Sequence, residues 1–130
     1  MKHLAFIVVS LALSSLPVLP QEKKDTGIDL QRECLAIQAT SRSSYDYQQA
    51  AHCFGYIMGV RVPLRIWQET NSEKHLPLTD VPACIPLEAT NGELVQVVLH
   101  YLDQHPNKLH MGYDELVLLA LGDAYPCSAN

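Results

Sequence analysis

Four cysteines and six histidines are the residues of this chain that could do chemistry. Cys53 directly follows His52, and a thiol beside an imidazole could serve nucleophilic catalysis if the base were hydrogen-bonded to the nucleophile. Both residues lie in the stretch "AAHCFGYIMGVRVPL", which has a helical pattern, and adjacent residues on a helix point in different directions. The spacing therefore disfavours a catalytic pair and favours a structural cysteine.

Three of the histidines recur at steps of five residues, at His100, His105 and His110. That step does not bring ligands to one face of a helix, and Pro106 interrupts any helix between the second and third of them. No G-x-S-x-G, H-E-x-x-H or phosphate-loop motif is present. We therefore expect no metal site and no cofactor, and nothing in the pattern indicates an enzyme.

The first 20 residues have the pattern of an export signal, with Lys2 before the apolar run "LAFIVVSLAL" and then small residues and prolines. We expect a signal peptide over residues 1–20 and a mature protein in the periplasm or secreted. Cleavage after Ser14 and cleavage nearer Gln21 both stay open. An uncleaved membrane anchor also remains an alternative, although the two prolines at the end of the run argue against it.

The mature part is acidic. Removing residues 1–20 leaves eight basic and 14 acidic residues, a formal charge of −6. Such a balance disfavours contact with a phosphate backbone, so nucleic acid is not an expected partner.

All four cysteines lie in the mature part, at Cys34, Cys53, Cys84 and Cys127. In a small exported protein an even number of cysteines indicates disulfides, and four cysteines allow three pairings. A hairpin of the first two helices would bring Cys34 to the level of Cys53. Cys84 precedes the third helix and Cys127 follows the fourth, at the same end of an antiparallel pair. We therefore prefer Cys34–Cys53 and Cys84–Cys127.

Helical periodicity predicts an all-α fold, a small bundle of about four to five helices stapled by two disulfides. Thr26 with Asp29, and Thr90 with Glu93, have the spacing of capping boxes at the starts of two helices. The second helix is expected from Tyr45 towards Trp67, with Pro63 as a kink or a break. Prolines and charges predict an exposed loop over residues 69–86.

Two glycines, Gly55 and Gly59, lie in the second helix, four residues apart and beside Tyr56. Four polar or helix-breaking residues interrupt this apolar stretch, so it is too short to span a membrane. A glycine inside a helix costs up to about 1 kcal/mol relative to alanine. We therefore expect another helix of the same chain to lie close across these three residues. A homodimer through this face is the alternative.

The ordered set of motifs resembles the Rap/Tai family of immunity proteins. The resemblance covers residues 26–127 and rests on the four cysteines together with "CFGYIMG", "CIP", "VQVVLHYLDQHP" and "ALGDAYPC". Members of that family are small periplasmic helical proteins that neutralise peptidoglycan-cleaving amidases delivered by type VI secretion. By resemblance, the cysteines and the Gly55, Tyr56 and Gly59 positions shape the fold. The stretch "VRVPLRIWQ" departs from the family pattern by placing Pro63 in a helix that members usually continue.

The resemblance implies a protein that acts by binding a cell-wall hydrolase. We expect the predicted loop that starts at residue 69 to determine which partner the protein recognises, because loops on a rigid scaffold commonly carry recognition. Its candidate contacts, placed over the cleft of the enzyme, are Glu69, Asn71, Ser72, Glu73 and Asp80.

Two other functions remain open. Six histidines and 14 acidic residues would change the charge of the chain in acid, as a small periplasmic acid-stress chaperone requires. A secreted factor that binds a host protein cannot be separated from an immunity protein on sequence alone.

Overall fold

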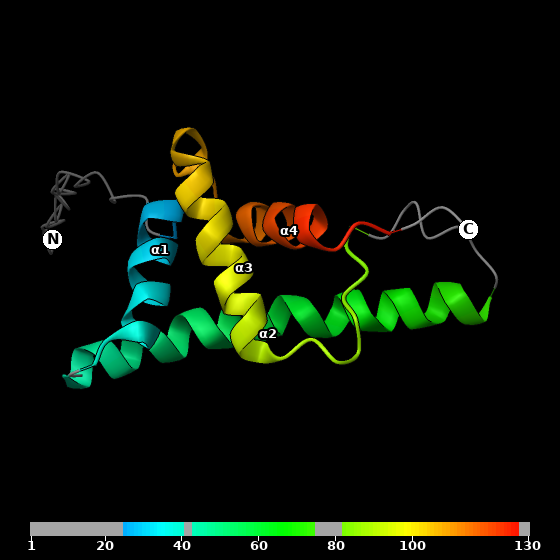
Figure 1. Cartoon of the computed structure of the whole chain (residues 1–130), viewed down its shortest axis with the longest axis horizontal. Helices are drawn as coiled ribbons and strands as arrows, with labels where there is room; N and C mark the ends of the chain where they lie inside the picture. The colour runs from blue at the N-terminus through cyan, green and yellow to red at the C-terminus, as the bar shows by residue number, and fades with distance from the viewer. Residues whose placement is uncertain (1–24, 41–42, 75–81, 128–130) are drawn as a thin grey trace, which may run out of the picture.

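The computed structural model describes residues 25–40, 43–74 and 82–127, and this part of the chain is all-α as predicted. Figure 1 shows its four α-helices, to which two short 3₁₀ helices are added. The elements in chain order are α1 (Gly27–Leu35), η1 (Ala36–Gln38), α2 (Ser44–Glu73), α3 (Asn91–Gln104), η3 (Pro106–Lys108) and α4 (Tyr113–Ala124). The expected signal peptide lies outside the described residues.

The helix α1 crosses the N-terminal part of α2, and a disulfide joins them at the crossing (Figure 1). Thr26 and Asp29 form the expected capping arrangement, in which the Thr26 hydroxyl donates to Asp29 Oδ2 at 2.9 Å. Leu30 and Cys34 lie one turn apart on the buried face. The predicted Cys34–Cys53 pairing is confirmed, and this disulfide fixes α1 on α2.

The helix α2 is longer than the sequence predicts. It continues without interruption through Pro63 and ends at Glu73, so the expected loop does not begin at residue 69. Proline removes a hydrogen bond to the carbonyl four residues earlier, here that of Gly59. Pro63 and Gly59 are both exposed, so water can satisfy this carbonyl instead of a buried group having to do so.

The helices α3 and α4 pack together and against α2. Thr90 caps α3 by accepting a hydrogen bond from the backbone N–H of Glu93 at 3.2 Å, as the capping-box pattern predicts. Arg61 of α2 holds the start of α3, donating to Asn91 Oδ1 and to the carbonyl of Ala89. The second disulfide, Cys84–Cys127, joins the segment before α3 to the segment after α4.

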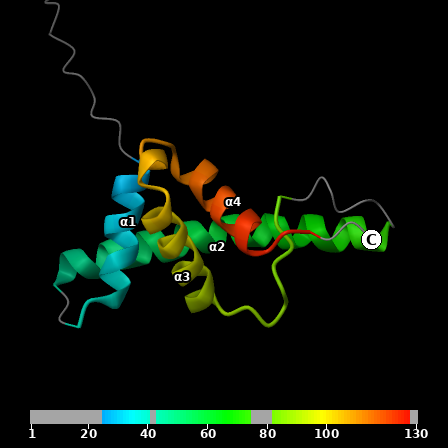
Figure 2. The ribbon, with the colours of Figure 1, turned by 45° about the horizontal axis from the view of Figure 1, so that its top comes forward.

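The core lies where the four helices meet, and Figure 2 shows α3 and α4 lying over the middle of α2. Its largest fully buried side chains are Leu30, Ile57, Ile85, Leu94, Leu102, Leu116 and Leu121. Two glycines allow neighbouring segments of the chain to approach the helices closely. A Cβ atom on Gly27 would lie 2.6 Å from Leu116 Cδ1, and one on Gly122 would lie 2.7 Å from the carbonyl oxygen of Pro82.

Within residues 25–40, 43–74 and 82–127, no helix combines the length and the apolar character that a bilayer crossing requires.

Candidate functional site

The C-terminal part of α2 carries four of the five residues expected to contact a partner. This segment, residues 62–73, is called the α2 arm here, and it extends past α3 and the end of α4 in both views (Figures 1 and 2). Glu69, Ser72 and Glu73 are exposed on it. They belong to a rigid helix and not to a loop, which corrects the sequence prediction, while Asp80 lies outside the described residues.

Asn71 does not fit the role expected of it. Its side chain lies on the buried face of the arm and only 8% of the residue is exposed. Leu64 lies seven residues earlier on the same face and is also buried. Asn71 therefore offers little surface to a partner, and its contact with one stays a prediction.

Apolar side chains are the feature of the α2 arm that sequence reasoning missed. Val62 and Ile66 lie one turn apart and are 58% and 59% exposed, and Trp67 is 45% exposed. The signal that could have revealed them is the one-turn spacing of Val62 and Ile66 beside Trp67, which places apolar side chains on neighbouring positions of a helix. The arm therefore presents apolar anchors as well as carboxylates.

A shallow pocket lies between the α2 arm and the segment leading into α3. Its lining includes Glu69, Ser72 and Glu73 from the arm, and Ile85 and Leu87 from the other side. Its volume is about 260 Å³. Arg65 donates to Glu69 at 3.0 Å, so one carboxylate is paired within the helix, and Leu87 is 71% exposed at the rim. The pocket can receive a small side chain of a partner.

The face of α2 at Gly55 and Gly59 is open, contrary to expectation. A Cβ atom on either glycine would find nothing within 4 Å, and both residues are exposed. No helix of the described chain lies across them, so the prediction of close helix packing is wrong there. Tyr56 does pack inward, with its ring edge-on to Tyr113 at 5.2 Å between centroids. The glycines border an open groove of about 540 Å³.

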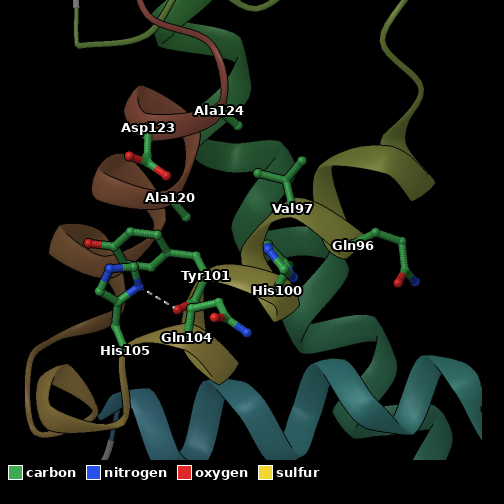
Figure 3. Close-up of a pocket in the computed structure, with 9 residues that line it drawn as sticks. All are labelled: Gln96, Val97, His100, Tyr101, Gln104, His105, Ala120, Asp123 and Ala124. Carbon is green, nitrogen blue, oxygen red and sulfur yellow. Dashed lines mark hydrogen bonds between the residues drawn. The ribbon is translucent and has the colours of Figure 1, made fainter.

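His100 of α3 and His105, the residue that caps this helix, line a pocket of about 310 Å³ between α3 and α4 (Figure 3). His105 Nδ1 lies 2.9 Å from the Tyr101 carbonyl oxygen. The His105 ring also stacks on the Tyr101 ring at 4.1 Å. In the part of the chain that the structure describes, no three His, Cys, Asp or Glu side chains are grouped to hold a metal ion.

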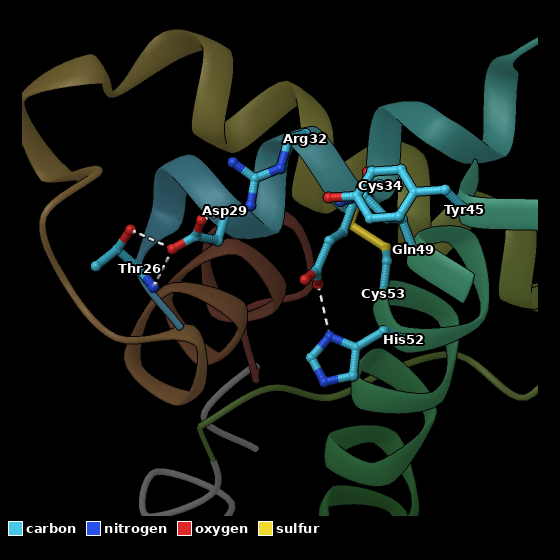
Figure 4. Close-up of polar contacts among 9 residues, drawn as sticks. Thr26, Asp29, Arg32, Cys34, Tyr45, Gln49, His52 and Cys53 are labelled. Atoms are coloured by element: carbon cyan, nitrogen blue, oxygen red, sulfur yellow. Dashed lines mark hydrogen bonds and ion pairs between the residues drawn. A yellow bond between two sulfur atoms is a disulfide. The ribbon is translucent and has the colours of Figure 1, made fainter. Parts of the chain in front are cut away.

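A second polar region lies where α1, α2 and the start of α4 meet. This polar pocket has a volume of about 290 Å³ and is lined by Asp25, Asp29, Arg32, Glu33, Tyr45, Gln48, Gln49, His52 and Tyr113. His52 Nδ1 lies 2.6 Å from Glu33 Oε2, and Figure 4 shows the His52 ring beside the Cys34–Cys53 disulfide. The sulfur of Cys53 is already bonded, so it does not act as a thiol nucleophile beside His52.

Tyr113 is the most constrained group of the polar pocket. The residue is 2% exposed, and its hydroxyl oxygen is buried with no hydrogen-bond partner among the described residues. Burial and the nearby carboxylate of Glu33 raise the pKa of Tyr113 well above its usual value. Glu33 contributes to this rise through a side-chain hydrogen bond and through its charge, so the hydroxyl interacts with the Glu33 carboxylate although the contact falls short of full hydrogen-bonding geometry.

Charged groups at the edge of the polar pocket are paired locally. Burial of Asp29 opposes its ionisation, but hydrogen bonds from Arg32 and Thr26 outweigh that effect and lower the pKa of Asp29. Arg32 Nη2 lies 2.6 Å from Asp29 Oδ1. This exposed pair orients the two side chains at the pocket edge.

The comparisons with known proteins give one match. Residues 26–127 match the family described as Rap1a immunity proteins, which agrees with the resemblance seen in the sequence. Neither the curated proteins nor the solved structures contain a match to this chain. The two disulfides and the family indicate an extracytoplasmic protein. The chain belongs to the Rap1a immunity protein family, and its partner is a secreted effector protein.

Proposed function

We propose that this protein binds a peptidoglycan-cleaving amidase in the periplasm and inhibits it by laying the α2 arm over the active-site cleft. The family supports the effector as partner, and the acidic mature chain with its export-signal pattern supports the compartment. Inhibition of this kind needs no chemistry from the inhibitor, because excluding the substrate from the cleft is sufficient.

The observation that carries the proposal is the exposure of large apolar side chains on a rigid, projecting helix. Ile66 and Trp67 are about half exposed on the α2 arm. Aromatic and large aliphatic side chains dominate the binding energy of protein interfaces, and a helix that is already ordered pays little entropy on binding. The arm therefore has the properties of an anchor that enters a groove.

Carboxylates at the end of the α2 arm would complement a basic rim on the amidase. Glu73 is exposed at the last residue of the helix, and Glu69 lies one turn before it. Charges at the rim of an interface affect the association rate and its salt dependence more than the final affinity. Asp80 is retained as a proposed contact of the same kind.

The open face at Gly55 and Gly59 would serve a different contact, the packing of a second copy of this chain. Glycines allow two helices to approach closely, and here the space above both is unoccupied in one protomer. Sedimentation velocity of the mature protein should therefore show a dimer, and a Gly55→Leu variant should be monomeric. A Gly55→Leu variant that remains a dimer would contradict this contact.

The binding test uses the mature protein and a purified peptidoglycan amidase effector. Isothermal titration calorimetry should give a 1:1 ratio of chains and a dissociation constant in the nanomolar range. Ile66→Asp and Trp67→Ala should each weaken binding by about 30-fold or more, because each removes a buried anchor worth about 2 kcal/mol.

A matched control is available on another helix. Leu119 of α4 is 37% exposed and lies outside the α2 arm, so Leu119→Asp introduces the same charge on another apolar spot. It should leave the affinity within about twofold of the wild type. Equal losses for Ile66→Asp and Leu119→Asp would refute the arm as the binding surface, even if the hydrolase is the correct partner.

A further inference from the structure

We propose that Asn91 is a site of spontaneous modification, because the Asn91–Gly92 pair at the start of α3 can deamidate, and that Arg61 of α2 controls the rate by holding the pair in an unreactive conformation. This inference concerns the start of α3, so it does not depend on the α2 arm or on the identity of the effector.

The chemistry of this pair needs no enzyme, because the two reacting groups belong to neighbouring residues. The backbone nitrogen of Gly92 attacks the side-chain carbonyl carbon of Asn91, so that a bond from this nitrogen to Cγ forms and the bond from Cγ to Nδ2 breaks. Ammonia leaves with the proton of the attacking nitrogen, and a cyclic succinimide remains. Water then opens the ring at either carbonyl and gives aspartate or isoaspartate.

Gly92 leaves the attacking nitrogen unshielded. The residue is exposed, and a Cβ atom on it would find nothing within 4 Å, so packing does not require a glycine here. Gly92 is the second residue of α3, and the first four N–H groups of a helix have no acceptor within the helix. The Thr90 hydroxyl accepts from the N–H of Glu93 instead. No hydrogen bond of the helix therefore protects the N–H of Gly92.

The helical conformation of Asn91 opposes the reaction. Asn91 is the first residue of α3, and a helical backbone directs the next nitrogen away from the carbonyl carbon of the side chain. The attack therefore requires Asn91 to leave the helix, and its rate depends on the population of this locally open state. Helix ends fray, so contacts that keep the start of α3 closed determine how fast Asn91 is modified.

Arg61 holds the start of α3 from outside that helix. Its Nη1 donates to Asn91 Oδ1, and its Nη2 donates to the carbonyl oxygen of Ala89 at 2.8 Å. The two hydrogen bonds grip the chain on both sides of Thr90, and one of them fixes the carboxamide that has to turn towards the attacking nitrogen. Hydrogen bonds from a charged donor are among the stronger ones, and these two are partly buried. Arg61 is therefore a positioning residue that keeps the reactive pair closed.

The two products differ in their effect on α3. Aspartate adds a negative charge to the first turn, where the helix dipole favours it, and keeps an oxygen that can accept from Arg61. Isoaspartate adds a methylene group to the backbone, so the capping box between Thr90 and Glu93 loses its spacing. Modification of Asn91 is therefore an irreversible change in how α3 begins.

The test follows the mature protein at pH 8 and 37 °C in water enriched in ¹⁸O, which labels each deamidated chain. A glutamate-specific protease releases residues 89–93, and mass spectrometry gives the modified fraction of this peptide over time. A sample unfolded in guanidinium chloride gives the rate of the unprotected sequence. The folded protein should react more slowly than the unfolded sample by about tenfold or more. Equal rates in the two samples would overturn the proposal.

Arg61→Gln should raise the rate at Asn91 in the folded protein by about tenfold, because it removes two charge-assisted hydrogen bonds from the start of α3. Arg32→Gln is the matched control, since it removes a guanidinium whose partner is Asp29 on the same helix. It should leave the rate within about twofold of the wild type. Equal rates for Arg61→Gln and Arg32→Gln would overturn the proposal.

A stability control separates local opening of α3 from unfolding of the whole chain. Gly27→Ala forces a Cβ atom against Leu116 and weakens the core without touching the contacts of Arg61. Its rate at Asn91 should stay close to that of the wild type, because opening is local. Acceleration by Gly27→Ala equal to that by Arg61→Gln would show that the reaction needs global unfolding and would overturn the proposal.

Thr90→Ala provides a second variant in case Arg61→Gln does not fold. It removes the cap that holds the same backbone from within the chain, at a cost of about 1 kcal/mol to the helix. Faster modification of Asn91 in Thr90→Ala than in Gly27→Ala supports control by the closed start of α3. A rate no higher than that of Gly27→Ala would overturn the proposal, and it would leave the inhibition of an amidase untouched.

Discussion

His52 Nδ1 lies 2.6 Å from Glu33 Oε2, and each of these residues is the sequence neighbour of one cysteine of the Cys34–Cys53 disulfide. The contact between α1 and α2 is therefore held by a covalent bond and by a polar pair one residue away. This doubly held contact places α1 on the N-terminal half of α2, and it also forms one corner of the polar pocket.

Removing this disulfide should destabilise the protein without changing the fold. The two cysteines are 19 residues apart, and a loop of that size corresponds to about 3 kcal/mol in the chain-entropy description. A double variant, Cys34→Ala with Cys53→Ala, should lose about that much free energy of unfolding in a urea titration. A loss below about 1 kcal/mol would contradict the view that the bond restrains the unfolded chain.

Two glycines should respond to alanine in opposite directions. Gly27→Ala forces a Cβ atom to 2.9 Å from the Leu109 Cα atom, where backbone has to move, and should cost about 2 kcal/mol. Gly55→Ala meets open space in a helix interior and should stabilise the monomer by up to about 1 kcal/mol. Thermal unfolding of both variants measures this. Destabilisation by Gly55→Ala would indicate a neighbour across that face.

Tyr113→Phe should leave the stability unchanged or raise it, because the hydroxyl that is removed is buried without a hydrogen bond. The raised pKa of Tyr113 has a matching consequence in alkali. The folded state holds this proton more tightly than the unfolded state, so the stabilisation is complete below about pH 10 and is lost as the pH rises above it.

Urea titrations at pH 7 and at pH 11 test both statements. The wild type should lose more stability than Tyr113→Phe between these two pH values. If Tyr113→Phe loses more than about 1 kcal/mol at pH 7, the hydroxyl has a partner in the folded protein.

Acid should weaken the starts of two helices. Hydrogen bonds from Thr90 lower the pKa of Glu93, and those from Arg32 and Thr26 lower the pKa of Asp29. Carboxylates with a lowered folded-state pKa contribute stability above the ordinary carboxyl pKa of about 4, and this contribution disappears as the pH falls through the folded-state value.

Glu93→Gln should therefore be less stable than the wild type at pH 7, and the two should converge near pH 2. Far-UV circular dichroism during urea unfolding at each pH provides the comparison, with Glu88→Gln as a control that should track the wild type. A difference between Glu93→Gln and the wild type that persists at pH 2 would show that the charge of Glu93 is not the cause.

The parts of the fold that the sequence predicts well are those set by local chemistry. The capping boxes at Thr26 and Thr90 are present because a hydroxyl three residues before a carboxylate satisfies the same backbone groups in any context. The family resemblance was also correct, and it rested on the order of the cysteines and glycines along the chain.

The errors concern α2, where local and tertiary effects compete. Pro63 predicts a kink or a break, but Pro63 and Gly59 are both exposed, so water can satisfy the freed carbonyl and the helix continues to Glu73. The cost of Gly55 and Gly59 in a helix predicts a close contact within the chain, but the space above both glycines is open.

The polar pocket could not be read from the sequence at all. Two residues that line it, Glu33 and Tyr113, are 80 residues apart, and their proximity depends on how α4 lies against α1 and α2. No periodicity or motif records such a juxtaposition. The role of Arg61 in holding the start of α3 was missed for the same reason.

The inhibition of peptidoglycan hydrolysis tests the central claim most directly. Purified sacculi are digested by a peptidoglycan amidase effector, and the release of soluble fragments is followed at increasing ratios of immunity protein. The account predicts that hydrolysis stops at one chain per enzyme, that added soluble peptidoglycan fragments compete with the inhibitor, and that Ile66→Asp restores hydrolysis while Leu119→Asp does not. Undiminished hydrolysis at a tenfold excess of the wild-type protein would contradict it.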